Sequence, residues 1–367
     1  MTELTLPNGV RSIGDFAFYG CSGLTELTLP NSVTSIGDGA FRGCSGLTEL
    51  TLPNSVTSIG DGAFRGCTGL TELTLPNSVA SIGDFAFSDC SGLEKITVES
   101  GNSCYDSRDN CNSIIDTETN TLIVGCKNSV IPNSVTSIGD GAFRGCSGLT
   151  ELTLPNSITS IGDGAFCGCS GLTELTLPNS VTSIGDCAFY GCTGLTELIL
   201  PNSVSSIGDI AFTYCSGLEK ITVESGNSCY DSRDNCNSII DTEFNTLIVG
   251  CKNSVIPNSV TSIGYYAFYG CSGLTELTLP ASVASIGDGA FICCSDLSKI
   301  TSLAEIPPVC GSGVFDRVNK TNCELIVPVI SVTAYKQAEV WNEFSNISGF
   351  SGVEVTVAGK TRKIVVE

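Results

Sequence analysis

The sequence predicts a β-rich α/β repeat protein, in which short coils of chain stack into a solenoid. A 23-residue unit recurs through most of the 367 residues, as the spacing from Leu47 to Leu70 shows. Within the unit, alternating leucines such as Leu50 and Leu52 are typical of a short strand with one buried face. One unit cannot bury its apolar face alone, so neighbouring units have to stack in a one-dimensional array.

The copies differ little from one another. They begin at Leu24, Leu47, Leu70, Leu149, Leu172, Leu195 and Leu274. Two longer units of 33 residues, 93–125 and 218–250, interrupt the series, and a divergent 23-residue unit follows each of them. Counted from residue 1 to Asp296, the pattern predicts about twelve coils. The two long units start 125 residues apart, which indicates the duplication of a block.

The composition limits what such an array can do. A formal net charge of −21 disfavours nucleic acid and anionic membrane surfaces as partners, because both attract Lys and Arg. No apolar run approaches the roughly 18 residues that a membrane span needs, and no signal peptide is visible. Because Met1 falls inside a repeat, we expect the natural chain to begin earlier.

The first half of each unit predicts two short strands, as the copy from Leu47 illustrates. Pro53 follows the leucine strand and turns the chain. Val56 and Ile59 then point back toward the core, on a second short strand. Gly60 ends that strand.

The second half of the unit predicts a single helical turn. Asp61 suits the position before a helix, where its carboxylate accepts free backbone N–H groups of the next turn. Ala63, Phe64 and Cys67 then share one face of that turn. We expect Phe64 to be part of the core.

The pattern LxxLxLPxxVxxIGxxAFxxC closely resembles the BspA-like, or Treponema-type, leucine-rich repeats of bacterial surface proteins. The resemblance covers residues 1–296, and the 33-residue units also look like units of that family. It implies a leucine-rich-repeat solenoid with an extracellular, cell-surface role in binding host proteins or other cells. Ser55 stands where other leucine-rich classes have Asn, so we expect no tight Asn ladder. We also expect less helix and a shallower curve than in those classes.

The period is lost after Asp296, and residues 297–349 are predicted to form a C-terminal capping segment, which resembles the closing segment of the same family. Residues 324–328 can supply a final strand, and 331–344 are predicted to be a helix. The buried face of that helix comprises Ala334, Ala338 and Trp341. Trp341 is expected to plug the open end of the core. Residues 353–366 alternate like a hairpin, so 350–367 form a hairpin-like tail or linker.

Cysteine is abundant, and ten of the 21 residues share one repeat position. They are Cys21, Cys44, Cys67, Cys90, Cys146, Cys169, Cys192, Cys215, Cys271 and Cys294. A zinc site needs converging ligands, often with His, and the sequence has no His. Stacked equivalents have Cβ atoms about 4.8 Å apart, outside the usual disulfide range of about 3.5–4.5 Å. We therefore expect buried, free thiols in this ladder. A disulfide bond between Cys104 and Cys111, and one between their copies Cys229 and Cys236, stays an alternative.

Acidic residues form two further lines. One comprises Glu26, Glu49, Glu72, Glu151, Glu174 and Glu197, and the other Asp38, Asp61, Asp84, Asp140, Asp163, Asp186 and Asp209. Carboxylates 5 Å apart repel by roughly 0.8 kcal/mol in water, so no bound cation is required, although calcium between the lines stays an alternative. Without His, and without phosphate-binding or dinucleotide motifs, we predict no catalytic, metal or cofactor site. A carboxylate pair of the glycosidase kind is disfavoured because the acids recur in every coil.

The sequence thus predicts a non-enzymatic cell-surface or extracellular module that binds extracellular or cell-surface proteins. The alternative is a structural scaffold that self-associates; a designed consensus protein is disfavoured by the many free cysteines. Variation between coils is concentrated around the Ala-Phe pair, and exposed aromatics there favour partner binding. The predicted partner-binding residues are Tyr265, Tyr266, Tyr269, Tyr19 and Tyr190. The competing interpretation is that these rings only cover neighbouring coils.

Overall fold

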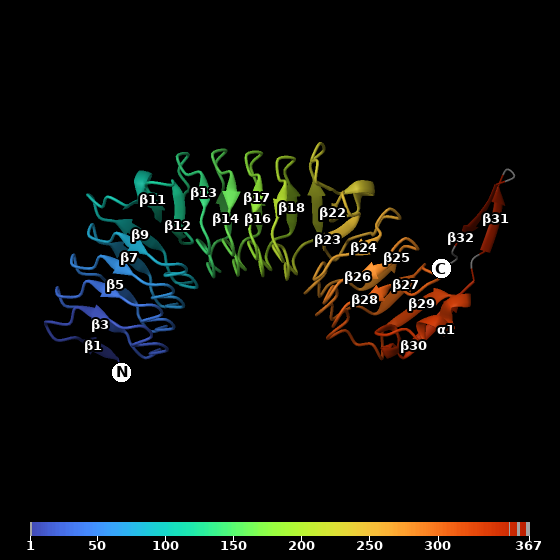
Figure 1. Ribbon diagram of the computed structural model, residues 1–367, viewed down its shortest axis with the longest axis horizontal. Coiled ribbons are helices and arrows are strands. Elements are labelled where there is room, and N and C mark those ends of the chain that lie inside the picture. Colours follow the sequence, from blue (N-terminus) through green and yellow to red (C-terminus); the bar gives the residue numbers. More distant parts are fainter. Residues whose placement is uncertain (1, 352, 358–359, 365–367) are drawn as a thin grey trace. The chain divides into compact units, whose positions relative to one another are not determined.

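The computed structural model of the chain describes residues 2–351, 353–357 and 360–364. It shows a β-solenoid of about 15 turns with few helices, which confirms the predicted fold (Figure 1). Its contacts divide the array into two compact units, each a stack of coils. The first comprises Met1–Glu197 with Ser203–Phe212, and the second Leu198–Asn202 with Thr213–Glu367.

The leucine strands of successive coils pair in parallel and in register, so that Leu50 lies beside Leu73. In the first unit they are β1 (Glu3–Thr5), β3 (Glu26–Thr28), β5 (Glu49–Thr51), β7 (Glu72–Leu75), β9 (Lys95–Val98), β14 (Glu151–Thr153) and β16 (Glu174–Thr176). From the unit boundary onward they are β18 (Glu197–Leu200), β20 (Lys220–Val223), β25 (Glu276–Leu279), β27 (Lys299–Ser302), β29 (Glu324–Pro328) and β30 (Asn346–Phe350). The buried face predicted for the leucine strand is confirmed, because the equivalent residues Leu27, Leu50, Leu73, Leu152, Leu175 and Leu198 are all buried.

The predicted second strand is confirmed as a two-residue Ser-Ile strand in most coils, which also pairs in parallel with its neighbours. In the first unit these strands are β2 (Ser12–Ile13), β4 (Ser35–Ile36), β6 (Ser58–Ile59), β8 (Ser81–Ile82), β13 (Ser137–Ile138), β15 (Ser160–Ile161), β17 (Ser183–Ile184) and β19 (Ser206–Ile207). In the second unit they are β24 (Ser262–Ile263), β26 (Ser285–Ile286) and β28 (Val309–Cys310).

Each 33-residue unit replaces the second half of a coil with a small antiparallel sheet. The first has β10 (Tyr105–Asp106), the 3-10 helix η1 (Arg108–Asn110), β11 (Ser113–Asp116) and β12 (Thr121–Gly125). The second has β21 (Tyr230–Asp231), η2 (Arg233–Asn235), β22 (Ser238–Asp241) and β23 (Thr246–Gly250). The last strand of each sheet joins the column of Ser-Ile strands, because β12 pairs with β13 and β23 with β24. The array therefore continues through both long units.

The predicted helical turn around Phe64 is wrong, although its buried face is right. The segment makes successive tight turns, in which the Arg65 N–H donates to Gly62 and the Cys67 N–H to Phe64. The alternate N–H groups donate to the next coil instead: that of Phe64 reaches the carbonyl of Ala86 at 2.8 Å. A continuous helix cannot form because half of its N–H groups are used along the stack.

Phe64 is fully buried, so the prediction that it belongs to the core is confirmed. Its ring stacks on those of Phe41 and Phe87, each with 5.4 Å between ring centroids and nearly parallel planes. The same stack continues along the coils of each unit. One phenylalanine per coil therefore forms the centre of the core.

Polar side chains also form ladders between coils. The Ser55 hydroxyl donates to the carbonyl of Val33 at 2.6 Å, so serine supplies a ladder where other leucine-rich classes use Asn. The Asp61 carboxylate accepts the N–H of Asp84, in the next coil, at 2.9 Å. The prediction that it serves its own turn is wrong, because the local N–H groups already bond within the turn or to the next coil.

The C-terminal segment continues the coil pattern, which explains why about twelve coils were predicted and about 15 are observed. Strand β27 pairs with β25 on one side and β29 on the other, and β30 pairs with β29. The predicted strand 324–328 is therefore confirmed, but it is not the final strand. That residues 297–349 act as a capping segment stays a proposal.

The helix predicted over residues 331–344 is wrong. The structure has η3 (Val329–Ser331), α1 (Val332–Tyr335) and η4 (Trp341–Glu343) instead, because Val340 has a φ of 67° that interrupts a helix. Ala334 is exposed and Tyr335 takes its place in the core. Trp341 is fully buried as expected: its indole N–H donates to Pro308 at 2.8 Å.

The hairpin predicted near the C-terminus is observed in part. Strands β31 (Val353–Val357) and β32 (Lys360–Ile364) pair antiparallel. Residues 358–359 and 365–367, which belong to the same prediction, lie outside the described residues.

Candidate partner-binding site

Three of the predicted site residues, Tyr265, Tyr266 and Tyr269, lie together in the second unit, and Tyr214 joins them. The ring centroids of Tyr265 and Tyr266 are 5.7 Å apart, and those of Tyr266 and Tyr269 are 5.6 Å apart, with near-perpendicular planes. The Tyr214 ring lies 5.7 Å from that of Tyr269. Tyr214 is 41% exposed and Tyr265 is 45% exposed, while the other two are half-buried. We call these four residues the tyrosine cluster.

Two members of the cluster occupy positions where many other coils have glycine, although Phe16, Phe85, Cys187 and Ile210 share the position of Tyr266. Tyr266 has a φ of 51° and Tyr214 a φ of 62°, in the left-handed region that side chains disfavour. The equivalent residues Gly62 and Gly66 have φ values of 57° and 74°. Holding a residue other than glycine in such a conformation costs about 1–3 kcal/mol. The coil therefore keeps its shape, and the two tyrosines are displayed at a cost in stability.

Part of the cluster also covers the next coil, as the competing interpretation of these rings expects. A Cβ atom on Gly289 would lie only 2.4 Å from Cε1 of Tyr266, so that ring rests directly against the glycine. Tyr265 stands where other coils have the ladder aspartate, which removes one carboxylate from that line. The exposed area of the cluster therefore belongs mainly to Tyr214 and Tyr265.

Tyr214 was missed by the sequence-based prediction, although a signal was present. It replaces the glycine that precedes the ladder cysteine in other coils, in the last coil before the second long unit. The second long unit has its small antiparallel sheet in place of the turn segment that follows the Ser-Ile strand in other coils. Tyr214 therefore meets the turn segment of the coil after the long unit, and its N–H donates directly to the carbonyl of Tyr269 at 3.0 Å. Residues 55 apart in sequence thus become neighbours.

The corresponding place in the first unit has charged residues instead of tyrosines. Asp89 and Arg144 stand 125 residues before Tyr214 and Tyr269, and the Asp89 N–H donates to the carbonyl of Arg144 at 2.8 Å. The Asp89 carboxylate lies 2.8 Å from the guanidinium of Arg65 and 3.5 Å from that of Arg144. The same backbone junction therefore supports an ion-pair cluster in one unit and an aromatic cluster in the other.

The remaining predicted site residues, Tyr19 and Tyr190, lie on separate coils of the first unit. Tyr19 is exposed, packs edge-on against Phe16 with 6.1 Å between centroids, and has the Arg42 guanidinium 5.9 Å from its ring centre. Tyr190 is half-buried, and its carbonyl accepts the N–H of Gly168. The structure does not bring these two residues together.

The cysteine ladder is buried as predicted, except that Cys21 is half-buried. Most ladder thiols donate to a carbonyl of an earlier coil; that of Cys44, for example, lies 3.2 Å from the oxygen of Phe18. Burial raises the pKa of Cys44 to about 11 and that of Cys90 to about 12. A thiolate is the reactive form of cysteine, so these side chains are suited to packing and not to chemistry.

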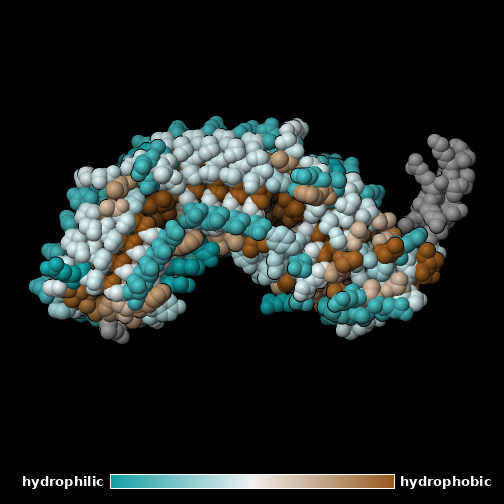
Figure 2. Space-filling model, in the orientation of Figure 1, coloured by the Kyte–Doolittle hydropathy of each residue, from teal (hydrophilic) through white to brown (hydrophobic). Residues whose placement is uncertain are grey.

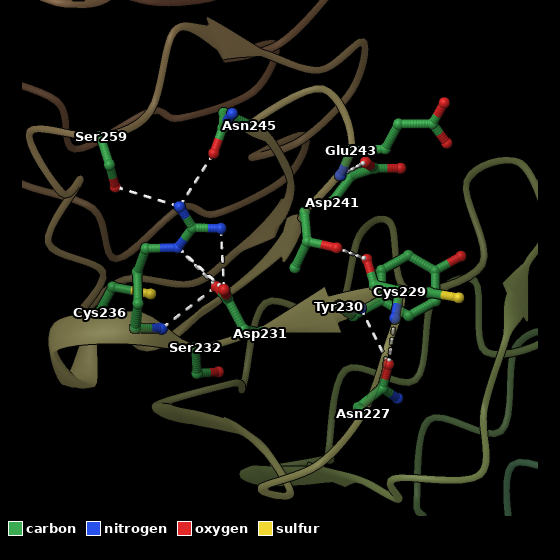
Figure 3. A network of polar contacts seen from close by, with 12 residues as sticks. Asn227, Cys229, Tyr230, Asp231, Ser232, Cys236, Asp241, Glu243, Asn245 and Ser259 are labelled. Atoms are coloured by element: carbon green, nitrogen blue, oxygen red, sulfur yellow. Dashed lines mark hydrogen bonds and ion pairs between the residues drawn. The ribbon is translucent and has the colours of Figure 1, made fainter.

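The loop of the second long unit is held by its own polar network (Figure 3). The Arg233 guanidinium donates to the Asp231 carboxylate at 2.8 Å and to the Asn245 side chain at 2.9 Å. Cys229 and Cys236 lie on opposite sides of this network in Figure 3, and both thiols are free. The equivalent Arg108 makes the same contacts in the first long unit.

Metal sites and membrane-spanning helices are the remaining features that bear on function. In the part of the chain that the structure describes, no group of three or more His, Cys, Asp or Glu side chains is arranged to hold a metal ion. Among the same residues, no helix has the length and the apolar character that crossing a membrane requires.

Three bacterial proteins of known structure are similar to the chain. A leucine-rich repeat protein from Eubacterium ventriosum shares 24% identity, with a TM-score of 0.54 over 87% of this chain and 83% of that one. A leucine-rich cell surface protein from Faecalibacterium prausnitzii shares 24%, with a TM-score of 0.52 over 88% and 84%. The pneumococcal vaccine antigen PcpA shares 22%, with a TM-score of 0.53 over 83% and 74%. At these identities, the three similarities show that the chain shares the fold of these proteins.

The sequence itself identifies the family. No curated protein matches the chain. However, the BspA type leucine-rich repeat region matches residues 1–115, 121–240 and 237–325, which together cover most of the chain and all but its last coils. This chain is therefore a member of the BspA-type leucine-rich repeat family.

Proposed function

We propose that the chain is a non-enzymatic module of a bacterial cell-surface protein, which binds host extracellular or other cell-surface proteins through the tyrosine cluster of its second unit. Membership of the BspA-type family supports a repeat protein without enzymatic activity. A cell surface location is supported by the name of the similar Faecalibacterium protein.

The observation that carries the proposal is the cost of displaying Tyr214 and Tyr266. Most other coils place glycine at these positions without strain, and such a cost persists in functional sites because the strained residue is needed there. Tyrosine is enriched in binding surfaces, since its ring buries a large area with few rotatable bonds and its hydroxyl group still forms hydrogen bonds. The uniform Thr-Glu face of the leucine strands offers less to distinguish one partner from another.

The decisive variant returns the cluster to the repeat pattern: Tyr265→Asp, Tyr266→Gly and Tyr269→Arg. These are the residues of the coil at Asp61, Gly62 and Arg65, so the fold should be kept and the strain at residue 266 relieved. Binding to an array of extracellular-matrix and serum proteins is then measured by surface plasmon resonance. We expect binding to the partner found with the wild-type chain to weaken at least tenfold.

The matched control makes the same kind of change in the first unit, with Phe16→Gly and Tyr19→Arg. These residues also return to the repeat pattern, and binding should stay within twofold of the wild-type value. Undiminished binding of the Tyr265–Tyr269 variant would rule out the cluster as the contact surface. Light scattering over a concentration series separates partner binding from self-association, because growth of particle mass with concentration would favour the scaffold alternative.

A further inference from the structure

The first unit has a long groove of its own. A cavity of about 630 Å³ runs over the coils from Ile82 to Gly208, and a second of about 530 Å³ continues it from Ser12 to Gly83. The shorter cavity is lined only by the Ser, Ile, Gly and Asp positions of each coil, and the same positions form most of the lining of the longer one, which also includes residues 85–88 and parts of the first long unit. We call this the serine–aspartate groove. Figure 2 shows hydrophobic surface set between more hydrophilic margins along the coils.

One position along the groove cannot carry a side chain. A Cβ atom on Gly162 would lie 2.4 Å from the Asp140 carboxylate and 2.8 Å from its backbone nitrogen. The coils therefore stack at this distance only with glycine, which lets the aspartate of one coil lie directly against the backbone of the next. The floor of the groove is formed by buried isoleucines such as Ile161, with half-buried serines on one side and exposed aspartates on the other.

The charged side chains that line the longer cavity are all acidic. The longer cavity is lined by Asp84, Asp140, Asp163 and Asp186, and no Lys or Arg lines it. Asp140, Asp163 and Asp186 each use Oδ1 to accept a hydrogen bond from the next coil: the Oδ1 of Asp163, for example, accepts the N–H of Asp186 at 2.8 Å. Its Oδ2 atom accepts no hydrogen bond from the described part of the chain, and so it can accept one from a ligand.

The spacing of the carboxylates follows the coils. Stacked phenylalanine rings of neighbouring coils are 5.2 Å apart, as between Phe143 and Phe166 and between Phe166 and Phe189. This distance is close to the length of one sugar unit in an extended, β-linked glycan. The apolar floor suits the C–H face of a sugar ring, the serine hydroxyls suit its hydroxyl groups, and the carboxylates suit a protonated amine.

Phe85 adds an aromatic surface to the groove. It lines the longer cavity at the junction beside the first long unit, and it has a φ of 57° where other coils have glycine. A half-buried ring at that place offers a platform on which a sugar ring can stack.

From these contacts we propose that the serine–aspartate groove binds a linear β-linked glycan whose units carry free, positively charged amino groups. Each sugar unit of such a glycan is rotated by about half a turn relative to the one before it. An amine therefore meets every second carboxylate, and the sugar units in between place hydroxyl groups beside the other carboxylates. The inference does not depend on the tyrosine cluster, because it concerns residues of the first unit only.

The experiment uses the full chain and a β-1,4-linked glucosamine hexamer, with calorimetry at mildly acidic pH, where the amines of the glycan are charged. The variant combines Asp140→Asn, Asp163→Asn and Asp186→Asn. Asparagine keeps an oxygen that accepts the N–H of the next coil, so the fold is retained while the charge is lost. We expect binding to weaken at least tenfold, and to weaken for the wild-type chain as salt is added.

The matched control combines Glu151→Gln, Glu174→Gln and Glu197→Gln, which removes the same charge from the leucine-strand face. Its binding should equal that of the wild-type chain. A neutral cellulose hexamer should bind at least tenfold more weakly than the glucosamine hexamer. The proposal is overturned if the glucosamine hexamer does not bind, if the Asp variant binds it unchanged, or if the neutral hexamer or a lysine hexamer binds equally well.

Discussion

Replacing Phe64 with alanine is the most direct test of how the coils hold together. The side chain is fully buried and stacks on both neighbours, Phe41 and Phe87. Truncating a buried phenylalanine to alanine costs about 3–5 kcal/mol, through lost apolar contacts and the cavity left behind. Since two stacked ring contacts are lost, each worth about 0.5–1.5 kcal/mol, we expect a cost in the upper part of that range.

The loss should be local, because each coil contacts only its neighbours. Amide hydrogen exchange measures this directly at the N–H groups of Phe41 and Phe64, which donate to Ala63 and Ala86. Where exchange follows local opening, a cost of about 3–5 kcal/mol accelerates it roughly 10²- to 10⁴-fold. Amides several coils away should change much less.

The control for this test is Phe16→Gly. That ring is 57% exposed, and its φ of 54° suits glycine, so we expect this substitution to cause no loss of stability. The reasoning is refuted if Phe64→Ala changes the free energy of unfolding by less than about 1 kcal/mol, or if exchange accelerates equally in every coil.

Further predictions concern the thiols and the aspartate ladder. In reduced protein, Cys44 should react with a thiol reagent only after denaturation, whereas the half-buried Cys104 and Cys229 should react in the native state; rapid native reaction of every thiol would contradict the buried ladder. Because burial raises the pKa of Cys44 from 9.0 to about 11, its contribution to stability is fully present below pH 9 and is lost as the pH rises toward 11. Urea denaturation at pH 8 and pH 10 should show this decrease, and a Cys44→Ala variant should show less of it. Asp61→Ala should cost about 1 kcal/mol by removing the acceptor for Asp84, while Asp61→Asn should cost less; equal costs in urea denaturation would argue against the ladder.

The sequence predicted the parts of the fold that depend on residue periodicity. Leu50 and Phe64 recur at fixed phase, and a position that is apolar in every copy has to face the shared core. The turn around Phe64 could not be distinguished from a helix, because tight turns and a helical turn place Ala63 and Cys67 on the same face. The partner of Asp61 was missed for a similar reason: the acceptor and donor lie 23 residues apart in sequence and meet only when coils stack.

The candidate sites were predictable to different degrees. Tyr265, Tyr266 and Tyr269 stand out because they depart from the repeat, but Tyr214 joins them only through the missing turn segment of the long unit. The serine–aspartate groove has no signal of its own in the sequence. It forms only when coils stack, and Gly162 looks like an ordinary strand terminator until the distance to the neighbouring Asp140 is known.

The direction of the hydrogen bonds has a mechanical consequence. Bonds such as those from Thr57 to Thr34 and from Phe41 to Ala63 join one coil to the next, along the stack. Tension applied along a stack therefore loads them one coil at a time, as in peeling, instead of shearing a whole sheet at once. A coil occupies 5.4 Å of the stack at Phe64, whereas 23 extended residues reach roughly 80 Å. Each coil that opens thus lengthens the chain about fifteenfold over its folded rise, while the coils beyond it stay folded.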